Sequence, residues 1–235
     1  MNKIHDRDVA IQEARDILSG RYIVLDTETT GLNEPEACQV AWVHEDGTSF
    51  VGLCKPTKSI EQGAFNVHHI SNEMVANAPS IVDLMVRMPL SLDDVSVVIY
   101  NANFDTKVVE RSCAAGGSNF SFHNKTVHDA MLMYAAFRGE WNDYRGNYKW
   151  WKLGEAIKQC GIETQGELHD AAEDARMTRL LVIYMANQKK AIEAVEWPQR
   201  LISNPTNHYQ KITGIDFASP DGDKTGFYLP SDEDA

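Results

Sequence analysis

Residues 23–32 read Ile-Val-Leu-Asp-Thr-Glu-Thr-Thr-Gly-Leu, and this stretch predicts the centre of the fold. The apolar run at 22–26 favours a buried strand, and Gly31 marks its exit into a turn. Side chains two apart on a strand point to the same face, so we expect Asp26 and Glu28 side by side at the strand end. Paired carboxylates repel each other unless a cation lies between them, and oxygen ligands suit Mg²⁺ or Mn²⁺. The stretch therefore predicts a hard-metal site.

Length and composition are typical of one soluble globular domain: 235 residues, 43% hydrophobic and 24% charged. The net charge of −12 argues against a broadly cationic nucleic-acid binder, although bound cations or a local basic patch would still allow nucleic acid to bind. The four cysteines form no CxxC pair, which favours reduced thiols in the cytoplasm over a zinc site or a disulfide framework. The chain shows neither a signal peptide nor an apolar run of membrane-spanning length.

Hydrophobic periodicity and turn residues predict further strands and helices. Strands are expected at 22–26, 37–43, 48–54, 95–100 and 125–128. Helices are expected at 8–18, 71–77, 80–88, from Asp105 to about Gly116, at 129–137 and 151–160, and after His169. Residues 55–63 and 139–149 are expected to be loops, and 198–235 a polar, acidic tail beyond a folded domain of residues 1–197. The order predicts an α/β fold, a mixed sheet with helices on both faces.

Two further segments carry candidate functional residues. Asp105 follows the strand at 95–100 and opens a helix, where ligand sites gather in α/β sheets, although an aspartate there can also be a plain helix cap. His169 precedes a helix that Asp170 can cap, which leaves Asp174 on a different face; a histidine there can also be structural or solvated. Four carboxylates and one histidine together match a two-metal site with a general base.

These segments resemble the three motifs of the DEDDh 3′→5′ exonucleases, the family of the bacterial replicative polymerase proofreading subunit, exonuclease X and ribonuclease T. Residues 26–32 resemble the first motif, 101–105 the second, and His169 with Asp174 the third. The motifs stand in family order, and the resemblance covers roughly residues 21–190. It implies a ribonuclease-H-like fold with a mixed five-stranded sheet flanked by helices, and hydrolysis of 3′ ends to nucleoside 5′-monophosphates.

The resemblance also implies a role for each motif residue, with two Mg²⁺ ions for which Mn²⁺ substitutes. Asp26 would bridge both ions, and Glu28 and Asp174 would complete the ion that binds the attacking water. Asp105 would hold the ion at the leaving group, and His169 would be the general base.

Several other residues are predicted to contact the substrate. The backbone at 29–31 would meet the terminal sugar, and Leu32 would wedge against the last base. Residues 138–152 interleave aromatic with basic side chains, which suits single-stranded nucleic acid; alternatively, the tryptophans there pack the following helix, and one of them is expected in the core. The predicted substrate contacts are Thr29, Thr30, Gly31, Leu32, His68, Asn101, Phe104, Arg145 and Lys149, with core packing as the alternative for Phe104. His68 is included because residues 68–70 resemble a family segment that lies beside the terminal nucleotide.

Two residues depart from the family pattern: Gln39, near which an acidic residue is frequent, and Tyr100, where many relatives have histidine. Both leave the metal ligands intact. The sequence therefore predicts an Mg²⁺-dependent 3′→5′ exonuclease on single-stranded 3′ ends, with DNA favoured over RNA and a polymerase or replication partner compatible with the resemblance. The alternatives are a 3′→5′ exoribonuclease of the same family and a non-catalytic nucleic-acid-binding or polymerase-docking module.

Overall fold

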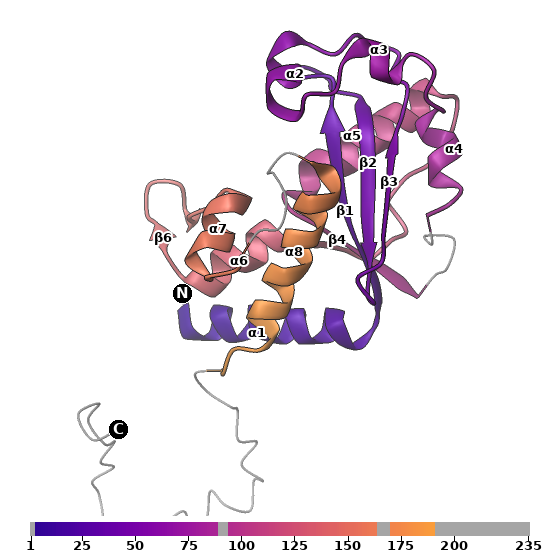
Figure 1. Ribbon diagram of the computed structural model, residues 1–235. Coiled ribbons are helices and arrows are strands. Elements are labelled where there is room, and N and C mark those ends of the chain that lie inside the picture. The colour runs from indigo at the N-terminus through magenta and orange to yellow at the C-terminus, as the bar shows by residue number, and fades with distance from the viewer. Residues whose placement is uncertain (1–2, 89–93, 164–169, 191–235) are drawn as a thin grey trace, which may run out of the picture. The chain divides into compact units, whose positions relative to one another are not determined.

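A five-stranded mixed sheet with helices on both faces forms the core of the computed structural model, which describes residues 3–88, 94–163 and 170–190 (Figure 1). The strand order is β3-β2-β1-β4-β5. The sheet strands are β1 (Arg21–Thr29), β2 (Ala37–His44), β3 (Ser49–Leu53), β4 (Val95–Ile99) and β5 (Val127–Asp129), and a separate hairpin comprises β6 (Trp141–Asn142) and β7 (Asn147–Tyr148). The helices are α1 (Lys3–Ser19), α2 (Gln62–His68), α3 (Asn72–Val75), α4 (Ile81–Met85), α5 (Ala102–Ala115), α6 (Ala130–Arg138), α7 (Leu153–Gln159) and α8 (Ala171–Ala186).

The central strand, β1, pairs antiparallel with β2 and parallel with β4. Its alternating side chains enter two different cores, as a strand between two helical layers requires. Tyr22 and Val24 pack in the cluster with α1, α6, α7 and α8, whereas Ile23 and Leu25 pack in the cluster with α4 and α5. The predicted mixed sheet with helices on both faces is therefore confirmed.

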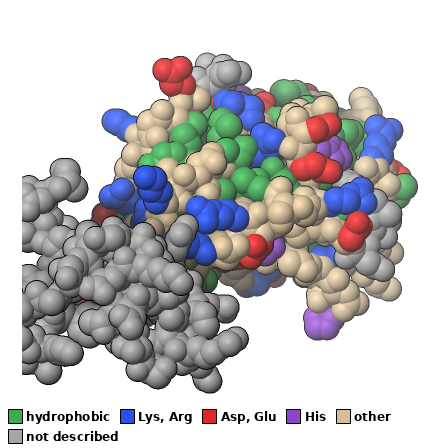
Figure 2. Space-filling model, turned by 90° about the horizontal axis from the view of Figure 1, so that it is seen from below, with side chains coloured by type: hydrophobic (Ala, Val, Ile, Leu, Met, Phe, Trp, Pro, Cys, Tyr) green, Lys and Arg blue, Asp and Glu red, His purple; other side chains and the backbone are tan. Residues whose placement is uncertain are grey.

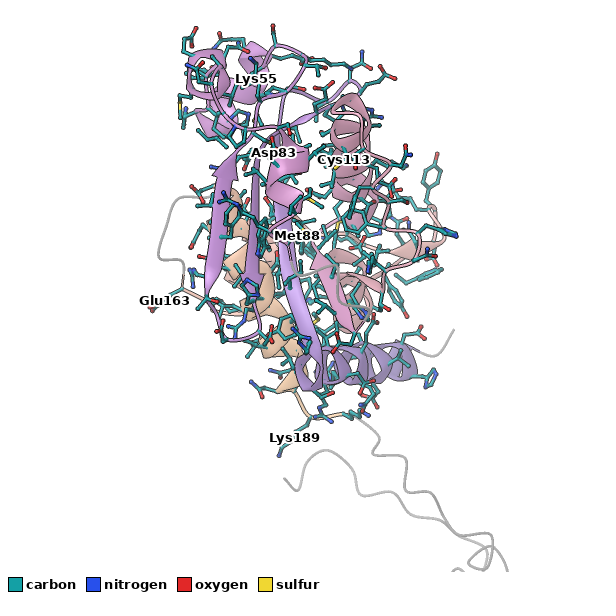
Figure 3. All side chains as sticks on the ribbon, turned by 90° about the vertical axis from the view of Figure 1, so that its right-hand side faces the viewer. Lys55, Asp83, Met88, Cys113, Glu163 and Lys189 are labelled. Carbon is teal, nitrogen blue, oxygen red and sulfur yellow. The ribbon has the colours of Figure 1, made fainter. Side chains whose placement is uncertain are left out.

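The second of these clusters can be followed in a side view of the molecule. Met88, just after α4, and Cys113, on α5, are labelled in Figure 3 and are both buried in the cluster with Ile23 and Leu25. No helix among the described residues is long and apolar enough to span a membrane.

Helix α8 is held at both ends by hydrogen bonds. At its N-terminus the Asp170 side chain accepts bonds from the backbone N–H groups of Ala172 and Glu173, as its predicted capping role requires. At its C-terminus Arg15 of α1 donates to the carbonyl oxygens of Ala186 and Gln188 at 3.0 and 2.9 Å. These bonds satisfy terminal backbone groups that a helix leaves without internal partners.

The structure differs from the sequence-based expectations mainly in short elements. The segment 139–149, expected to be a loop, contains the β6–β7 hairpin, with Gly146 at φ 65° in its turn. Helix α2 was not predicted, because His68 is its one buried residue and it lacks an apolar period. Helix α1 begins at Lys3 instead of Asp8. The predicted tail at 198–235 lies outside the described residues.

Helix α5 also begins earlier than expected, at Ala102 instead of Asp105. Asn101 precedes it in a left-handed conformation with φ 66°, and the N–H of Ala102 donates to Asp129 Oδ2 at 2.9 Å. Asp105 therefore lies in the first turn and is not the helix cap. The other carboxylate oxygen of Asp129 caps α6, so one side chain ties the starts of both helices.

We predict that Asp129→Ala lowers the free energy of unfolding by about 1–3 kcal/mol, because it removes a helix cap and leaves the Ala102 amide without its acceptor. Urea denaturation monitored by circular dichroism measures the change. Asp94→Ala is the control, because it breaks only an exposed ion pair with Arg21 and should cost less than about 1 kcal/mol. Equal losses in the two variants would contradict the double role of Asp129.

Candidate metal centre

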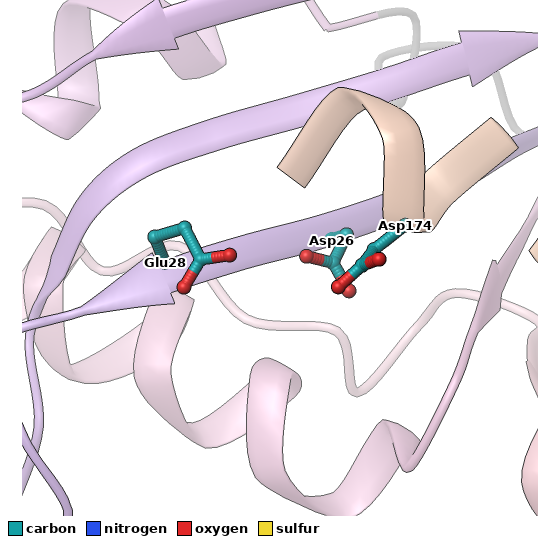
Figure 4. Close-up of side chains that lie close together, drawn as sticks. All are labelled: Asp26, Glu28 and Asp174. Atoms are coloured by element: carbon teal, nitrogen blue, oxygen red, sulfur yellow. The ribbon is translucent and has the colours of Figure 1, made fainter. Parts of the chain in front are cut away.

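Three carboxylates from β1 and α8 lie together in the structure (Figure 4). Asp26 and Glu28 share one face of β1, and Asp174 reaches them from the first turn of α8. One carboxylate oxygen of each residue lies within 4.8 Å of those of the other two. The structure thus brings together three of the four predicted metal ligands.

Burial and mutual repulsion make this group of carboxylates costly to ionise. Burial raises the pKa of Asp26 well above its usual range, and the charges of Asp105 and Asp174 raise it further. Burial, followed by the charges of Asp174 and Asp105, raises the pKa of Glu28 to about 8. A divalent cation would relieve this repulsion, and a donor set made only of carboxylate oxygens fits Mg²⁺ or Mn²⁺.

The fourth carboxylate, Asp105, does not belong to this three-carboxylate group. It is 4% exposed, and its Oδ1 accepts a hydrogen bond from Thr27 Oγ1 at 2.6 Å. Burial raises the pKa of Asp105, the hydrogen bond from Thr27 lowers it, and the resulting pKa is about 7. Asp105 is nevertheless close to Asp26. Its charge is the second-largest cause of the raised pKa of Asp26, and only burial contributes more.

The segment before α8 contains the predicted general base, His169, which lies outside the described residues. Next to it, Asp170 is the helix cap. Glu173, one residue before Asp174, accepts two hydrogen bonds from Arg176 at 2.7 and 2.6 Å and so takes part in an ion pair on α8.

The two residues that depart from the family pattern, Gln39 and Tyr100, both connect segments that are distant in sequence. Gln39 lies opposite Glu28 in the β1–β2 ladder, and its Oε1 accepts the N–H of Ala171, the first residue of α8, at 3.2 Å. The Tyr100 hydroxyl donates to the Trp151 carbonyl at 2.7 Å. Sequence reasoning noted both residues but missed these contacts, since partners so distant in sequence leave no local signal.

The turn after β1, residues 29–32, is ordered by its own hydrogen bonds. Thr29 Oγ1 donates to the carbonyl of Gly31, and Thr30 Oγ1 accepts the N–H of Glu36. The Leu32 side chain is 86% exposed, so it is accessible to a ligand.

His68 supports this turn from the buried side. Its Nδ1 accepts the N–H of Ile70 at 3.0 Å, so the proton is on Nε2, which donates to the Thr29 carbonyl at 3.0 Å. Of the other predicted substrate contacts, Asn101 is exposed, and Phe104 is half-buried and packs against the cluster with α4 and α5. The structure thus gives His68 a supporting role, while its predicted substrate contact stays a prediction.

Glu61 is a residue of this region that sequence reasoning missed. A Cβ atom added to Gly31 would lie 2.4 Å from the Glu61 carboxyl carbon and 2.6 Å from each of its oxygens. The Glu61 carboxylate therefore lies directly against the Gly31 backbone, and a side chain at position 31 would displace it. Glu61 precedes α2, which was itself not predicted, so no motif pointed to it.

The aromatic and basic segment forms the β6–β7 hairpin and the residues after it. Lys149 Nζ lies 3.6 Å from the centre of the Trp151 ring, and Arg145 is exposed near the turn. Trp151 packs against the core, as expected for one of the two tryptophans, while Trp150 is 50% exposed. Figure 2 shows one face of the molecule, on which Lys and Arg side chains lie beside exposed hydrophobic ones despite the net charge of −12.

Comparison with known proteins connects this geometry to a family. A family model described as "Exonuclease" matches residues 23–182. The uncharacterized exonuclease CP81 of Escherichia phage 186 is 35% identical over 173 residues, which are 71% of this chain and 89% of that protein. The PolC-type DNA polymerase III of Staphylococcus haemolyticus is 25% identical over 184 residues, and the chain spans only 12% of its length.

Solved structures show the same fold. Exonuclease X in complex with 5′-overhanging duplex DNA matches with a TM-score of 0.53 and 23% identity, over 71% of this chain and 91% of that one. Exonuclease I of E. coli in complex with a dA16 oligonucleotide matches with a TM-score of 0.55 and 20% identity, over 72% of this chain and 41% of that one. The expected ribonuclease-H-like sheet is therefore confirmed.

We predict that the metal-free protein loses stability as the pH rises. Glu28 has an ordinary pKa of 4.5 and a pKa of about 8 in the folded protein, so between these values the folded chain holds a proton that the unfolded chain has released. This proton stabilises the folded state at low pH, and the stabilisation is lost as the pH rises from 4.5 to about 8. The melting temperature in a chelator should therefore fall over this range. Divalent cations should raise it most at high pH, because ligands must be deprotonated to bind them.

Glu28→Gln should flatten this pH dependence, because the amide does not titrate. Glu45→Gln, at an exposed residue, is the control and should leave it unchanged. If the melting temperatures of wild type and Glu28→Gln change with pH by the same amount, Glu28 has an ordinary pKa and the prediction is wrong.

Proposed function

The chain belongs to the exonuclease family whose model matches residues 23–182, and we propose that it hydrolyses single-stranded DNA from the 3′ end with Mg²⁺, releasing nucleoside 5′-monophosphates. The observation that carries the proposal is the meeting of Asp26, Glu28 and Asp174, from two separate elements, in one partly buried group. Carboxylates this close together repel one another unless a cation lies between them. A two-metal phosphodiester hydrolase needs such a group of carboxylates to hold its ions.

The four carboxylates would hold two divalent ions, with Asp26 shared between them. Glu28 and Asp174 would complete one site and Asp105 the other. Bound there, the ions would stabilise the attacking and leaving oxygens of an in-line displacement at phosphorus.

His169 would act as the general base and take the proton from the attacking water, because imidazole titrates near neutral pH. Support comes from its position next to Asp170, the cap of the helix that carries Asp174.

The turn after β1 would bind the terminal nucleotide. The backbone at 29–31 would orient the sugar, and the exposed side chain of Leu32 would pack against the last base. The Glu61 carboxylate, which lies against Gly31, would accept a hydrogen bond from a terminal hydroxyl and repel a terminal phosphate. Arg145 and Lys149 would hold phosphates further along the strand.

The choice of DNA rests on the names of similar proteins, a DNA polymerase and two exonucleases in complex with DNA. The similarity to PolC also motivates a replication partner as part of the proposal. We also propose a cytoplasmic location, because cysteines stay reduced there and the four cysteines of this chain are free thiols. An exoribonuclease of the same family is the second candidate.

One assay tests polarity, sugar and metal dependence together. Oligonucleotides of DNA and RNA, single- and double-stranded and labelled at either end, are incubated with Mg²⁺ or a chelator. We expect single-stranded DNA to shorten from its 3′ end with Mg²⁺ only, and Asp26→Asn to abolish cleavage without unfolding the chain. Asp46→Asn, in an exposed turn, is the control with wild-type activity. Shortening from the 5′ end, or an active Asp26→Asn variant, would refute the proposal.

We further predict that His169→Ala slows cleavage by ~10²–10⁴-fold, the usual contribution of general acid–base catalysis. The pH–rate profile should lose its limb near neutrality, while Mn²⁺ binding should stay unchanged because no metal ligand is removed. His123→Ala, at an exposed position, is the matched control. If His169→Ala cleaves at the wild-type rate, another group is the base.

A further inference from the structure

Thr27 lies between Asp26 and Glu28 on β1 but points to the opposite face of the sheet. On that face Ile23 and Leu25 pack in the cluster with α4 and α5. Thr27 is 7% exposed, and its hydroxyl donates to Asp105 Oδ1 at 2.6 Å. The bond joins residues 78 apart in sequence and reaches from the central strand to the first turn of α5.

A hydroxyl at this position is not required by the fold. A buried β-branched strand residue could be valine, which has the same shape without a polar atom to desolvate. Among the described residues, the Thr27 hydroxyl donates its hydrogen bond to Asp105. The contact with Asp105 therefore explains why a polar side chain stands here.

The backbone beneath Asp105 is anchored independently of Thr27. Asn101 turns the chain at φ 66°, and the Ala102 amide is held by Asp129 at 2.9 Å. These two contacts place the backbone of α5, and the orientation of the Asp105 carboxyl group depends on the contacts of that group itself, among them the hydrogen bond from Thr27 Oγ1. A hydrogen bond to one of its two oxygens restricts that orientation.

We propose that Thr27 is the positioning residue of Asp105: its hydroxyl holds one carboxylate oxygen, so that the other oxygen faces the side of β1 where Asp26 lies and can bind the second divalent ion. The inference rests on the proposed function, because it assigns Asp105 to that ion. Thr27 itself touches neither ion nor substrate. Strand alternation then explains the order Asp-Thr-Glu: the two acids face the first ion, Asp26 is shared with the second, and the residue between them orients the further ligand of the second.

The test compares Thr27→Val, which keeps the shape and loses the hydroxyl, with Thr27→Ser, which keeps the hydroxyl. Free Mn²⁺ is measured by electron paramagnetic resonance during titration of the full chain, and kcat and KM are measured on a single-stranded oligonucleotide. We expect Thr27→Val to bind its first Mn²⁺ normally and its second ~10–100-fold more weakly, the usual effect of losing a hydrogen bond to a charged group. Its kcat should fall with little change in KM, and Thr27→Ser should restore both properties.

Two further variants separate positioning from a general effect on the core. Thr106→Val makes the same change next to Asp105, at a hydroxyl that bonds the Ala102 carbonyl within α5, and should leave the second Mn²⁺ unaffected. In an Asp105→Asn background, Thr27→Val should add no further loss, because the two residues act through one contact.

The outcomes distinguish this inference from the proposed function. If wild type binds two Mn²⁺ ions and cleaves DNA, and Thr27→Val does both equally well, the inference fails and the function stands. The same conclusion follows if Thr27→Val melts at a lower temperature but keeps wild-type affinity for the second ion, because the bond then stabilises only the core. If wild type binds no second Mn²⁺, the two-metal function and the inference fall together.

Discussion

The burial of three mutually repelling carboxylates, Asp26, Glu28 and Asp174, is the constraint on which the arrangement of this site depends. Three carboxylates within 4.8 Å of one another would separate if the elements carrying them were free to move. The surrounding structure opposes that separation. Gln39 holds the start of α8 to β2, Arg15 holds its other end to α1, and the apolar cluster beneath α8 joins it to the sheet.

The folded chain therefore keeps in place an arrangement that is unfavourable without a cation. This has a functional advantage for a metal enzyme, because a site formed in advance need not be assembled when the ion binds. The free energy for it comes from the burial of apolar side chains on both faces of the sheet, which is the dominant favourable contribution to folding.

Some of this structure could be read from the sequence, because it depends on local rules. Alternation along a strand places Asp26 and Glu28 on one face whatever the rest of the chain does. The Asp170 cap likewise follows from residue type at a helix start. In contrast, the β6–β7 hairpin and α2 were missed, because short elements with few buried residues carry little periodicity.

The sequence alone thus determined the family and the central strand and predicted the candidate metal ligands, since each depends on residue types at short spacing. The tertiary structure alone decided which of those residues meet. It brought Asp174 to β1, left Asp105 on the Thr27 side, and laid Glu61 against Gly31. The physical reason is that such contacts join distant segments and depend on how helices pack on the sheet, which no local pattern of residues specifies.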